Sequence, residues 1–317
     1  MRILMLTPDQ SLKYNWGHHL FRQEVARQAD VVFYGLRYPL YEKSGNDYVP
    51  EIVEEFGPFD VIFVEGPRYA GFFMGMEDVK GVIKTAILVD YNQTRRLHQY
   101  HRFIEKMDLS RVFFPIRASQ RKFLGQVRRK AVRNIQGDYL PFSVDTNIYR
   151  RLGVEKTFDV MAVFSVIQWA YPYRKKIQEL VTEMPVKALV SGGIPGARIV
   201  HEKYVECINR SKIFISESSI AKIVTMKYYE CLACGTFLLT DRPEGMEALG
   251  FVDGEHLVLY DGLDDLRGKI EYYLEHEQER EEIAERGMDL VRNRHSGKIR
   301  AKQFLRYLSD ENFVANC

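Results

Sequence analysis

The sequence has no apolar run long enough to cross a membrane. None of its windows reaches the ~18 apolar residues that a transmembrane helix needs. The apolar stretch at the start, MRILMLTPDQ, is too short for the core of a signal peptide and is not followed by a cleavage site. Low-complexity segments and short internal repeats are also absent. We therefore expect a cytoplasmic globular protein without a membrane span.

The sequence contains few cysteines and has a small net charge. Four cysteines in 317 residues do not make a disulfide framework, so we expect reduced thiols. A net charge of +2 gives no global attraction to nucleic acid or to a membrane. The charge is uneven, however, because residues 117–134 contain no acid but seven cations: Arg117, Arg121, Lys122, Arg128, Arg129, Lys130 and Arg133. This segment indicates either a solvated helix face or a surface for an anionic acceptor or phosphate.

Short apolar runs alternate with amphipathic stretches along the whole chain. In the first half the runs are 2–7, 31–34, 61–64, 85–89 and 112–114, and a second series starts at 158–166. They are apolar throughout rather than alternating, which is typical of strands in a parallel sheet covered on both faces. The pattern predicts a doubly wound α/β protein with two domains, 1–150 and 151–317. Ligands of such sheets bind beyond the carboxyl ends of the strands.

One stretch, MKYYECLACGTFLLTD at 226–241, raises the question of a metal or redox site because it contains Cys231 and Cys234. Zinc would need a second ligand pair, and the other two cysteines, Cys207 and Cys317, stand alone. The pair also falls at the C-terminal end of a predicted helix, where the helix dipole disfavours a thiolate. We therefore interpret both thiols as small packing residues between helix and sheet.

The same stretch resembles the donor-site element of GT-B glycosyltransferases of the glycosyl transferases group 1 and CgeB-like type. The matching residues are Lys227, Glu230, Ala233, Gly235, Thr240 and Asp241. The resemblance continues in the segments 255–261, 277–287 and 294–300, and upstream in YLPFSVD at 139–145 with Tyr149. Together these segments cover most of the second half, whereas the first half matches only in its pattern of strands and helices.

The resemblance implies a GT-B fold, in which two doubly wound Rossmann-like domains face each other across a cleft. It implies an acceptor-side domain at 1–150 and a donor domain at 151–317, whose last helix could cross back to the first domain. The implied function is transfer of a sugar from a nucleoside-diphosphate sugar, UDP or GDP, to an acceptor hydroxyl. The implied mechanism is retaining and needs neither a metal nor a cofactor. The acceptor, the sugar and the oligomeric state stay open.

The donor contacts follow from the same resemblance. Glu230 would accept hydrogen bonds from the ribose hydroxyls. Arg174, Lys222 and Lys227 would hold the diphosphate, although Arg174 and Lys222 could also be ordinary surface cations. Two loops of small residues would bring backbone close to the donor, one containing Ser218 and Ser219 and the other Gly193. A simple turn is an equally good interpretation of the Gly193 loop.

One position departs from the pattern of the family. Many retaining GT-B enzymes have a glutamate eight residues before the ribose-binding one, where this chain has Lys222. The contact with the sugar, and with it the stereochemical outcome, is therefore open. Two alternatives remain: a non-catalytic nucleotide-binding protein of GT-B type, or a nucleotide-sugar epimerase or phosphorylase.

Three residues of the first half are candidates for catalysis. His18 and His19 lie at the start of a predicted helix after the first strand, where either could act as a base or bind an oxyanion. Asp90 ends a predicted strand and could bind or deprotonate an acceptor hydroxyl. The alternatives are polar helix-start residues for the histidines and a helix cap for Asp90. His98 and His101 have a spacing that can bind metal, but no third ligand is visible, so we expect no metal site.

Overall fold

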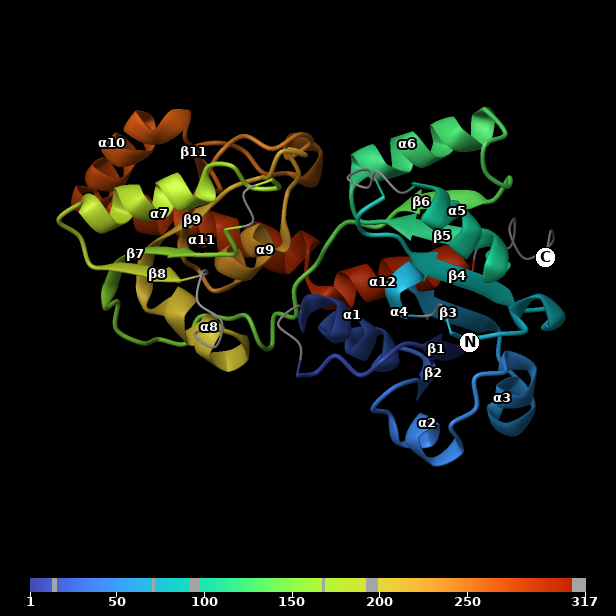
Figure 1. The fold of residues 1–317 in the computed structure, drawn as a ribbon. Coiled ribbons are helices and arrows are strands. Elements are labelled where there is room, and N and C mark those ends of the chain that lie inside the picture. The colour runs from blue at the N-terminus through green and yellow to red at the C-terminus, as the bar shows by residue number, and fades with distance from the viewer. Residues whose placement is uncertain (13–15, 70–71, 92–96, 167–168, 192–198, 310–317) are drawn as a thin grey trace. The chain divides into compact units, whose positions relative to one another are not determined.

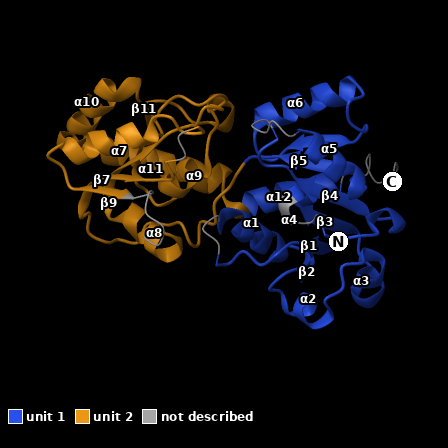
Figure 2. Cartoon of the chain, viewed as in Figure 1, with its two compact units in different colours: residues 1–141, 298–317 blue, residues 142–297 orange. Residues whose placement is uncertain are grey.

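The computed structural model describes residues 1–12, 16–69, 72–91, 97–166, 169–191 and 199–309. The chain divides into two compact units (Figure 2). Unit 1 comprises residues 1–141 and 298–317, and unit 2 comprises residues 142–297. The predicted boundary near residue 150 falls just inside unit 2.

Unit 1 is built on a six-stranded parallel sheet with the order β2-β1-β3-β4-β5-β6 (Figure 1). Its strands are β1 (Arg2–Leu6), β2 (Asp30–Tyr34), β3 (Val61–Glu65), β4 (Ile83–Ile87), β5 (Arg111–Phe114) and β6 (Gln136–Tyr139). Its helices are α1 (Trp16–Ala26), α2 (Pro39–Ser44), α3 (Val49–Phe56), α4 (Gly66–Tyr69), η1 (Met76–Asp78), α5 (Leu97–Lys106), α6 (Arg117–Arg128) and α12 (Gly297–Leu308).

The two faces of this sheet carry two separate hydrophobic cores. Successive side chains of a strand point to opposite faces, so in β1 Leu4 and Leu6 join one core while Ile3 and Met5 join the other. The first core is covered by α3, α5 and α6, and the second by α1 and α12. Phe304 of α12 stacks edge-on against Phe63 and packs against Phe113, which places the last helix of the chain within unit 1.

Unit 2 has a five-stranded parallel sheet with the order β11-β10-β9-β7-β8 (Figure 1). Its strands are β7 (Phe158–Val163), β8 (Ala188–Ser191), β9 (Ser211–Ser216), β10 (Phe237–Thr240) and β11 (Val258–Leu259). Its helices are α7 (Arg174–Glu183), α8 (His201–Asn209), α9 (Met226–Ala233), η2 (Glu247–Leu249), α10 (Gly262–Glu275) and α11 (Glu277–Arg294).

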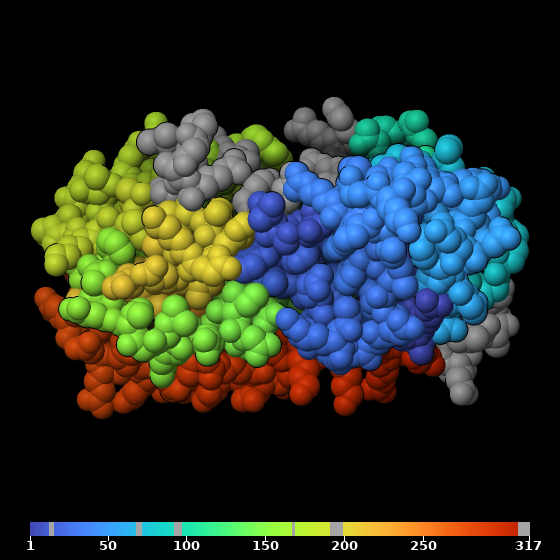
Figure 3. Space-filling model, turned by 90° about the horizontal axis from the view of Figure 1, so that it is seen from below, coloured from blue at the N-terminus to red at the C-terminus, as the bar shows by residue number. Residues whose placement is uncertain are grey.

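The helices of unit 2 are amphipathic and cover both faces of its sheet. α7, α10 and α11 contribute Ile177, Ile270 and Ile283 to one core. α8 lies at the surface, drawn in yellow in Figure 3, with Glu202 exposed and Tyr204 buried beneath it. No helix among the described residues is long and apolar enough to cross a membrane.

Candidate donor site

A cluster of four polar side chains surrounds the start of α9 in unit 2. Lys227 and Glu230 are three residues apart, which places them on neighbouring turns of one helix face. Tyr204 from α8 and Tyr149, which precedes β7, complete the cluster, and both are less than 10% exposed. The Lys227 Nζ donates a hydrogen bond of 2.9 Å to the Tyr204 hydroxyl and lies 4.7 Å from the centre of its ring.

The charges of this cluster act on one another at short range. Burial raises the pKa of Glu230, while the Lys227 charge and hydrogen bonds from the Tyr204 and Tyr149 hydroxyls lower it. Burial lowers the pKa of Lys227 to about 8, against the opposing charge of Glu230. Burial and the Glu230 charge raise the pKa of both tyrosines well above the usual value, so their hydroxyls stay protonated donors. The result is a carboxylate aligned by two hydroxyls beside an ammonium group whose pKa is lowered to about 8.

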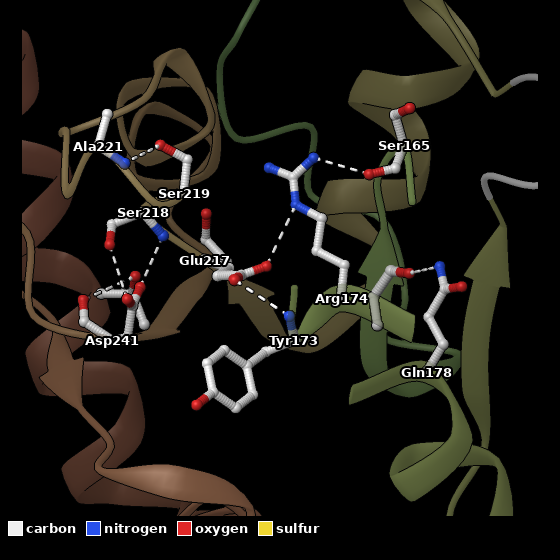
Figure 4. A network of polar contacts seen from close by, with 12 residues as sticks. Ser165, Tyr173, Arg174, Gln178, Glu217, Ser218, Ser219, Ala221 and Asp241 are labelled. Atoms are coloured by element: carbon white, nitrogen blue, oxygen red, sulfur yellow. Dashed lines mark hydrogen bonds and ion pairs between the residues drawn. The ribbon is translucent and has the colours of Figure 1, made fainter. Parts of the chain in front are cut away.

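Arg174 is the first residue of α7 and its side chain is held from several sides (Figure 4). One terminal nitrogen, Nη1, donates to the Ser165 carbonyl at 2.9 Å, and the guanidinium carbon lies 3.2 Å from the centre of the Tyr171 ring. Its Nε lies 3.7 Å from Oε2 of Glu217. Because the side chain is only 4% exposed, burial is the main cause that lowers the pKa of Arg174. The charge of Arg174 in turn lowers the pKa of Lys227, so the two cations are near neighbours.

Glu217 follows β9 and links this arginine to the first turn of α7. Its Oε1 accepts a hydrogen bond of 3.3 Å from the backbone N–H of Tyr173 (Figure 4). Burial raises the pKa of Glu217, whereas the Tyr173 N–H and the Arg174 charge lower it. The carboxylate is 3% exposed and therefore needs these partners to remain ionised.

Asp241, which follows β10, organises the loop after β9. It accepts hydrogen bonds of 2.6 Å from the backbone N–H and from the hydroxyl of Ser218, and one of 2.8 Å from the Lys222 ammonium. Ser219 and Lys222 have positive φ angles of 68° and 48°. The tight turn that results brings Lys222 back over Asp241. The amide of Ser218 is thus already occupied, which the sequence did not reveal.

The predicted donor residues of unit 2 are therefore brought together, except Gly193, which lies outside the described residues. Glu230, Lys227, Arg174, Glu217, Lys222 and Asp241 form one continuous line of charges that act on one another. Ser219 is buried beside this line, and its hydroxyl accepts a hydrogen bond of 3.2 Å from the backbone N–H of Ala221. Tyr149, Tyr204 and Glu217 were not predicted as site residues, although Tyr149 belongs to a motif that the sequence analysis singled out.

The three predicted catalytic residues lie in unit 1, near the carboxyl edge of its sheet. His18 is half-buried in the first turn of α1, and Asp90 is exposed after β4. Burial lowers the pKa of His18, the charges of Glu65 and Asp90 raise it, and the Arg22 charge lowers it. His19 is buried with its Nδ1 3.5 Å from Asp9 Oδ1, and burial lowers its pKa. The histidines are therefore held toward the neutral state, in which an imidazole can accept a proton.

A buried ion pair that was not predicted from the sequence lies next to these histidines. Arg22 is 2% exposed and its Nη1 lies 2.9 Å from Oε2 of Glu65, which also accepts hydrogen bonds from Thr7 at 2.5 Å and Gln10 at 3.2 Å. Two signals could have indicated it. Glu65 is the one charge ending the apolar strand VIFVE, and Arg22 lies four residues after His18 on the same helix face.

Cys231 and Cys234 are buried, burial raises the pKa of Cys234 to about 12, and the Cys231 thiol donates to the Thr236 carbonyl. Among the described residues no group of three potential ligands could hold a metal ion.

The basic segment, residues 117–134, forms α6 and the turn after it, and all its cations except Lys122 are exposed. One of them, Arg133, pairs with Asp108 at 2.6 Å.

Several solved structures have a similar fold over nearly the whole chain. HepE from Anabaena, in complex with UDP-glucose, is 13% identical and superposes with a TM-score of 0.69 over 98% of this chain and 99% of its own. A glycosyltransferase from Rickettsia africae has 11% identity and a TM-score of 0.68, over 100% and 99% of the two chains. Sucrose-phosphate synthase from Thermosynechococcus elongatus has 12% identity and a TM-score of 0.61 over 100% of both chains. The protein has the GT-B fold.

This GT-B chain also matches a family by sequence in its second half. Residues 174–306 fit the family described as glycosyl transferase-like, a segment that runs from Arg174 through α9 into α12. No curated protein matches the chain. The predicted fold class and the broader resemblance to glycosyltransferases are thus confirmed.

Proposed function

We propose that the protein is a glycosyltransferase that moves a sugar from a nucleoside-diphosphate sugar to an acceptor hydroxyl. The observation that carries this proposal is the Glu230 carboxylate, which two tyrosine hydroxyls align beside Lys227 within the glycosyl transferase-like segment. Within that family we assign it to the group 1 and CgeB-like type, on the motif around Glu230. We assign its place of action to the cytoplasm.

Unit 2 would bind the donor. A carboxylate can accept a hydrogen bond from each of two neighbouring ribose hydroxyls, and charged acceptors make the stronger bonds. Arg174, Lys222 and Lys227 would neutralise the diphosphate, with Ser218, Ser219 and Gly193 in the loops that approach it. UDP is the first nucleotide to consider, since HepE binds UDP and UDP-glucose; GDP is the second.

Catalysis would come from positioning and from stabilisation of the leaving diphosphate by these cations. On this proposal the enzyme needs no metal ion and no cofactor, and it retains the configuration of the sugar. The acceptor hydroxyl would be bound by unit 1, where His18, His19 and Asp90 are the candidates to orient it or to take its proton. The exposed cations of α6 would favour an anionic acceptor.

A thermal-shift panel tests the donor assignment. Wild-type protein is heated with UDP, GDP, TDP and ADP, and at least one diphosphate is expected to raise the melting temperature, since a ligand that binds only the folded state stabilises it. Glu230→Ala should lose that shift. Glu206→Ala, at an exposed position on α8, serves as the matched control and should keep it. A wild type that no nucleotide stabilises would contradict the proposal.

Turnover separates an enzyme from a nucleotide-binding protein of the same fold. Purified protein is incubated with UDP-glucose or GDP-mannose and with a cell extract as the source of acceptor. Release of nucleoside diphosphate that depends on the extract supports transfer. Release or epimerisation without the extract, or tight binding with no turnover on any extract, would point to the two alternatives named from the sequence.

A further inference from the structure

A cavity of about 560 Å³ opens at the carboxyl edge of the unit 2 sheet. Glu217, Asp241 and Tyr260 line it from the ends of β9, β10 and β11, and Tyr173 and Leu263 line it from the starts of α7 and α10. This volume is within the roughly 300–1,000 Å³ that is usual for small-molecule sites. Arg174, Lys227 and Glu230 do not belong to the described lining, so the cavity is a compartment beside the donor cluster.

Glu217 belongs to both regions, because it lines the cavity and also pairs with Arg174 of the donor cluster (Figure 4). Its Oε1 accepts the Tyr173 N–H, but its Oε2 is 3.7 Å from Arg174 Nε, which is too long for a hydrogen bond. Within the described chain this buried Oε2 accepts no hydrogen bond. This oxygen points toward Arg174, which lies outside the cavity lining, so Glu217 contributes negative charge to the cavity wall rather than a free acceptor (Figure 4).

The lining has more carboxylates than cations. Five acids contribute to it: Glu217, Asp241, Asp253, Asp261 and Asp265. The three cations are already paired, Lys222 with Asp241 at 2.8 Å, Lys269 with Asp265 at 2.7 Å, and Arg242 with Glu247 at 2.9 Å. The cavity therefore disfavours a second anionic group and favours hydroxyl or ammonium donors.

Apolar surface completes the lining. Tyr173 is 51% exposed, and Ile177, Leu259 and Leu263 add aliphatic surface. A ring with one apolar face and a rim of hydroxyls, which is the chemistry of a hexose, matches aromatic surface combined with carboxylate acceptors.

We propose that this cavity receives the sugar of the donor and selects a neutral or amino sugar against an acidic one. The assignment rests on the proposed function, because Lys222, one of the cations assigned to the diphosphate, lines the cavity together with Glu217, the partner of Arg174. A sugar attached to that diphosphate would enter the cavity past Glu217.

Reversing one charge of the cavity lining tests whether the cavity discriminates between neutral and acidic sugars. Asp261 lines the cavity, is exposed, and makes no side-chain capping bond to α10. Dissociation constants of UDP, UDP-glucose and UDP-glucuronic acid are measured by calorimetry for the wild type, Asp261→Lys and Asp264→Lys. Asp264 is the matched control, exposed in the same first turn of α10 but outside the lining.

The wild type is expected to bind UDP-glucose more tightly than UDP-glucuronic acid. Asp261→Lys should reduce the ratio of the dissociation constant of UDP-glucuronic acid to that of UDP-glucose by about fivefold at low salt, because the substitution changes the charge at the cavity by two units at short range. Asp264→Lys should leave the ratio unchanged. The ratio cancels any effect of the new lysine on the diphosphate, which both ligands share.

A second variant, which changes the volume of the cavity but not its charge, tests whether the sugar occupies the cavity. Leu263→Trp fills the cavity with a larger side chain. It should weaken the binding of UDP-glucose until its dissociation constant equals that of UDP, while the dissociation constant of UDP should not change. Equal ratios in Asp261→Lys and Asp264→Lys, or UDP-glucose binding that Leu263→Trp does not weaken, would overturn the cavity assignment alone. A wild type that binds none of the three ligands would overturn the UDP-sugar donor, and this inference with it.

Discussion

The Lys227 ammonium donates a 2.9 Å hydrogen bond to the Tyr204 hydroxyl, and that hydroxyl in turn hydrogen-bonds to Glu230. Tyr204 therefore connects the group assigned to the diphosphate with the group assigned to the ribose. The contact between α8 and α9 fixes both side chains before a ligand arrives, which lowers the entropy lost on binding.

Replacing Glu230 should weaken recognition of the ribose rather than of the phosphates. Glu230→Gln keeps the size of the side chain but removes its charge, so we expect a loss of about 1.5–3 kcal/mol in UDP binding. The effect should be much smaller for 2′-deoxy-UDP, which lacks one of the hydroxyls. Calorimetry with both ligands checks this. Equal losses for UDP and 2′-deoxy-UDP would show that Glu230 does not contact the 2′-hydroxyl.

The positions of two helices in the second half of the chain could be predicted because the sequence patterns that specify them are local. A helix that ends near Cys231 and Cys234 was predicted, and α9 runs Met226–Ala233 with Thr225 as its N-cap. A last helix was also predicted at the end of the chain, and α12 runs Gly297–Leu308. Both segments combine a clear apolar period with a polar start.

Other parts could not be predicted because their causes are not local. β6, QGDY, is a polar strand that forms only because β5 offers an edge to pair with. Tyr149, Tyr204 and Glu230 are far apart in the chain, and only the tertiary fold of unit 2 brings them together. The pairing of Arg22 with Glu65 depends in the same way on α1 lying over the end of β3.

Nucleotide-sugar binding should weaken as the pH rises through the pKa of the Lys227 ammonium. That pKa of about 8 in the free protein means that the cation is mostly present at pH 7 and mostly lost at pH 9. If the bound diphosphate keeps it protonated, the dissociation constant of UDP-glucose rises about tenfold between pH 7 and pH 9. Lys227→Arg should give a flat profile over this range, and a wild-type profile as flat as that of the variant would contradict the assignment.

The same depressed pKa has a consequence for folding. A lysine in the unfolded chain has a pKa of 10.5, whereas burial lowers the pKa of Lys227 in the folded protein to about 8, so between these pH values the unfolded chain binds more protons. The free energy of unfolding should therefore increase with pH in this window, and this contribution is lost as the pH falls through 8. Urea unfolding of the wild type and Lys227→Met at pH 7.5 and 9.5 checks the sign. The wild type should gain stability relative to the variant at the higher pH, and a relative loss would contradict the burial of a charged Lys227.

The Cys231 and Cys234 thiols should be inert in the folded protein. Both are buried, and burial raises the pKa of each, to about 12 for Cys234, so the reactive thiolate is absent near neutral pH. Iodoacetamide at pH 8 followed by peptide mass spectrometry should leave both unmodified until urea is added. Fast alkylation of native protein, or zinc bound in a one-to-one ratio by metal analysis, would contradict the packing role.

Breaking the ion pair beneath the histidines should destabilise unit 1 strongly. Glu65→Gln leaves the Arg22 guanidinium, 2% exposed, without its counter-charge, and removal of one partner of a buried pair costs about 3–5 kcal/mol. Replacing both partners, as Arg22→Met with Glu65→Gln, removes the uncompensated charge and should recover a large part of that loss. Thermal unfolding of the wild type, the two single variants and the double variant gives the coupling free energy. If the effects of the two single variants add up to that of the double variant, the coupling free energy is zero and the ion pair does not stabilise unit 1. The positions of His18 and His19 would then not depend on this pair.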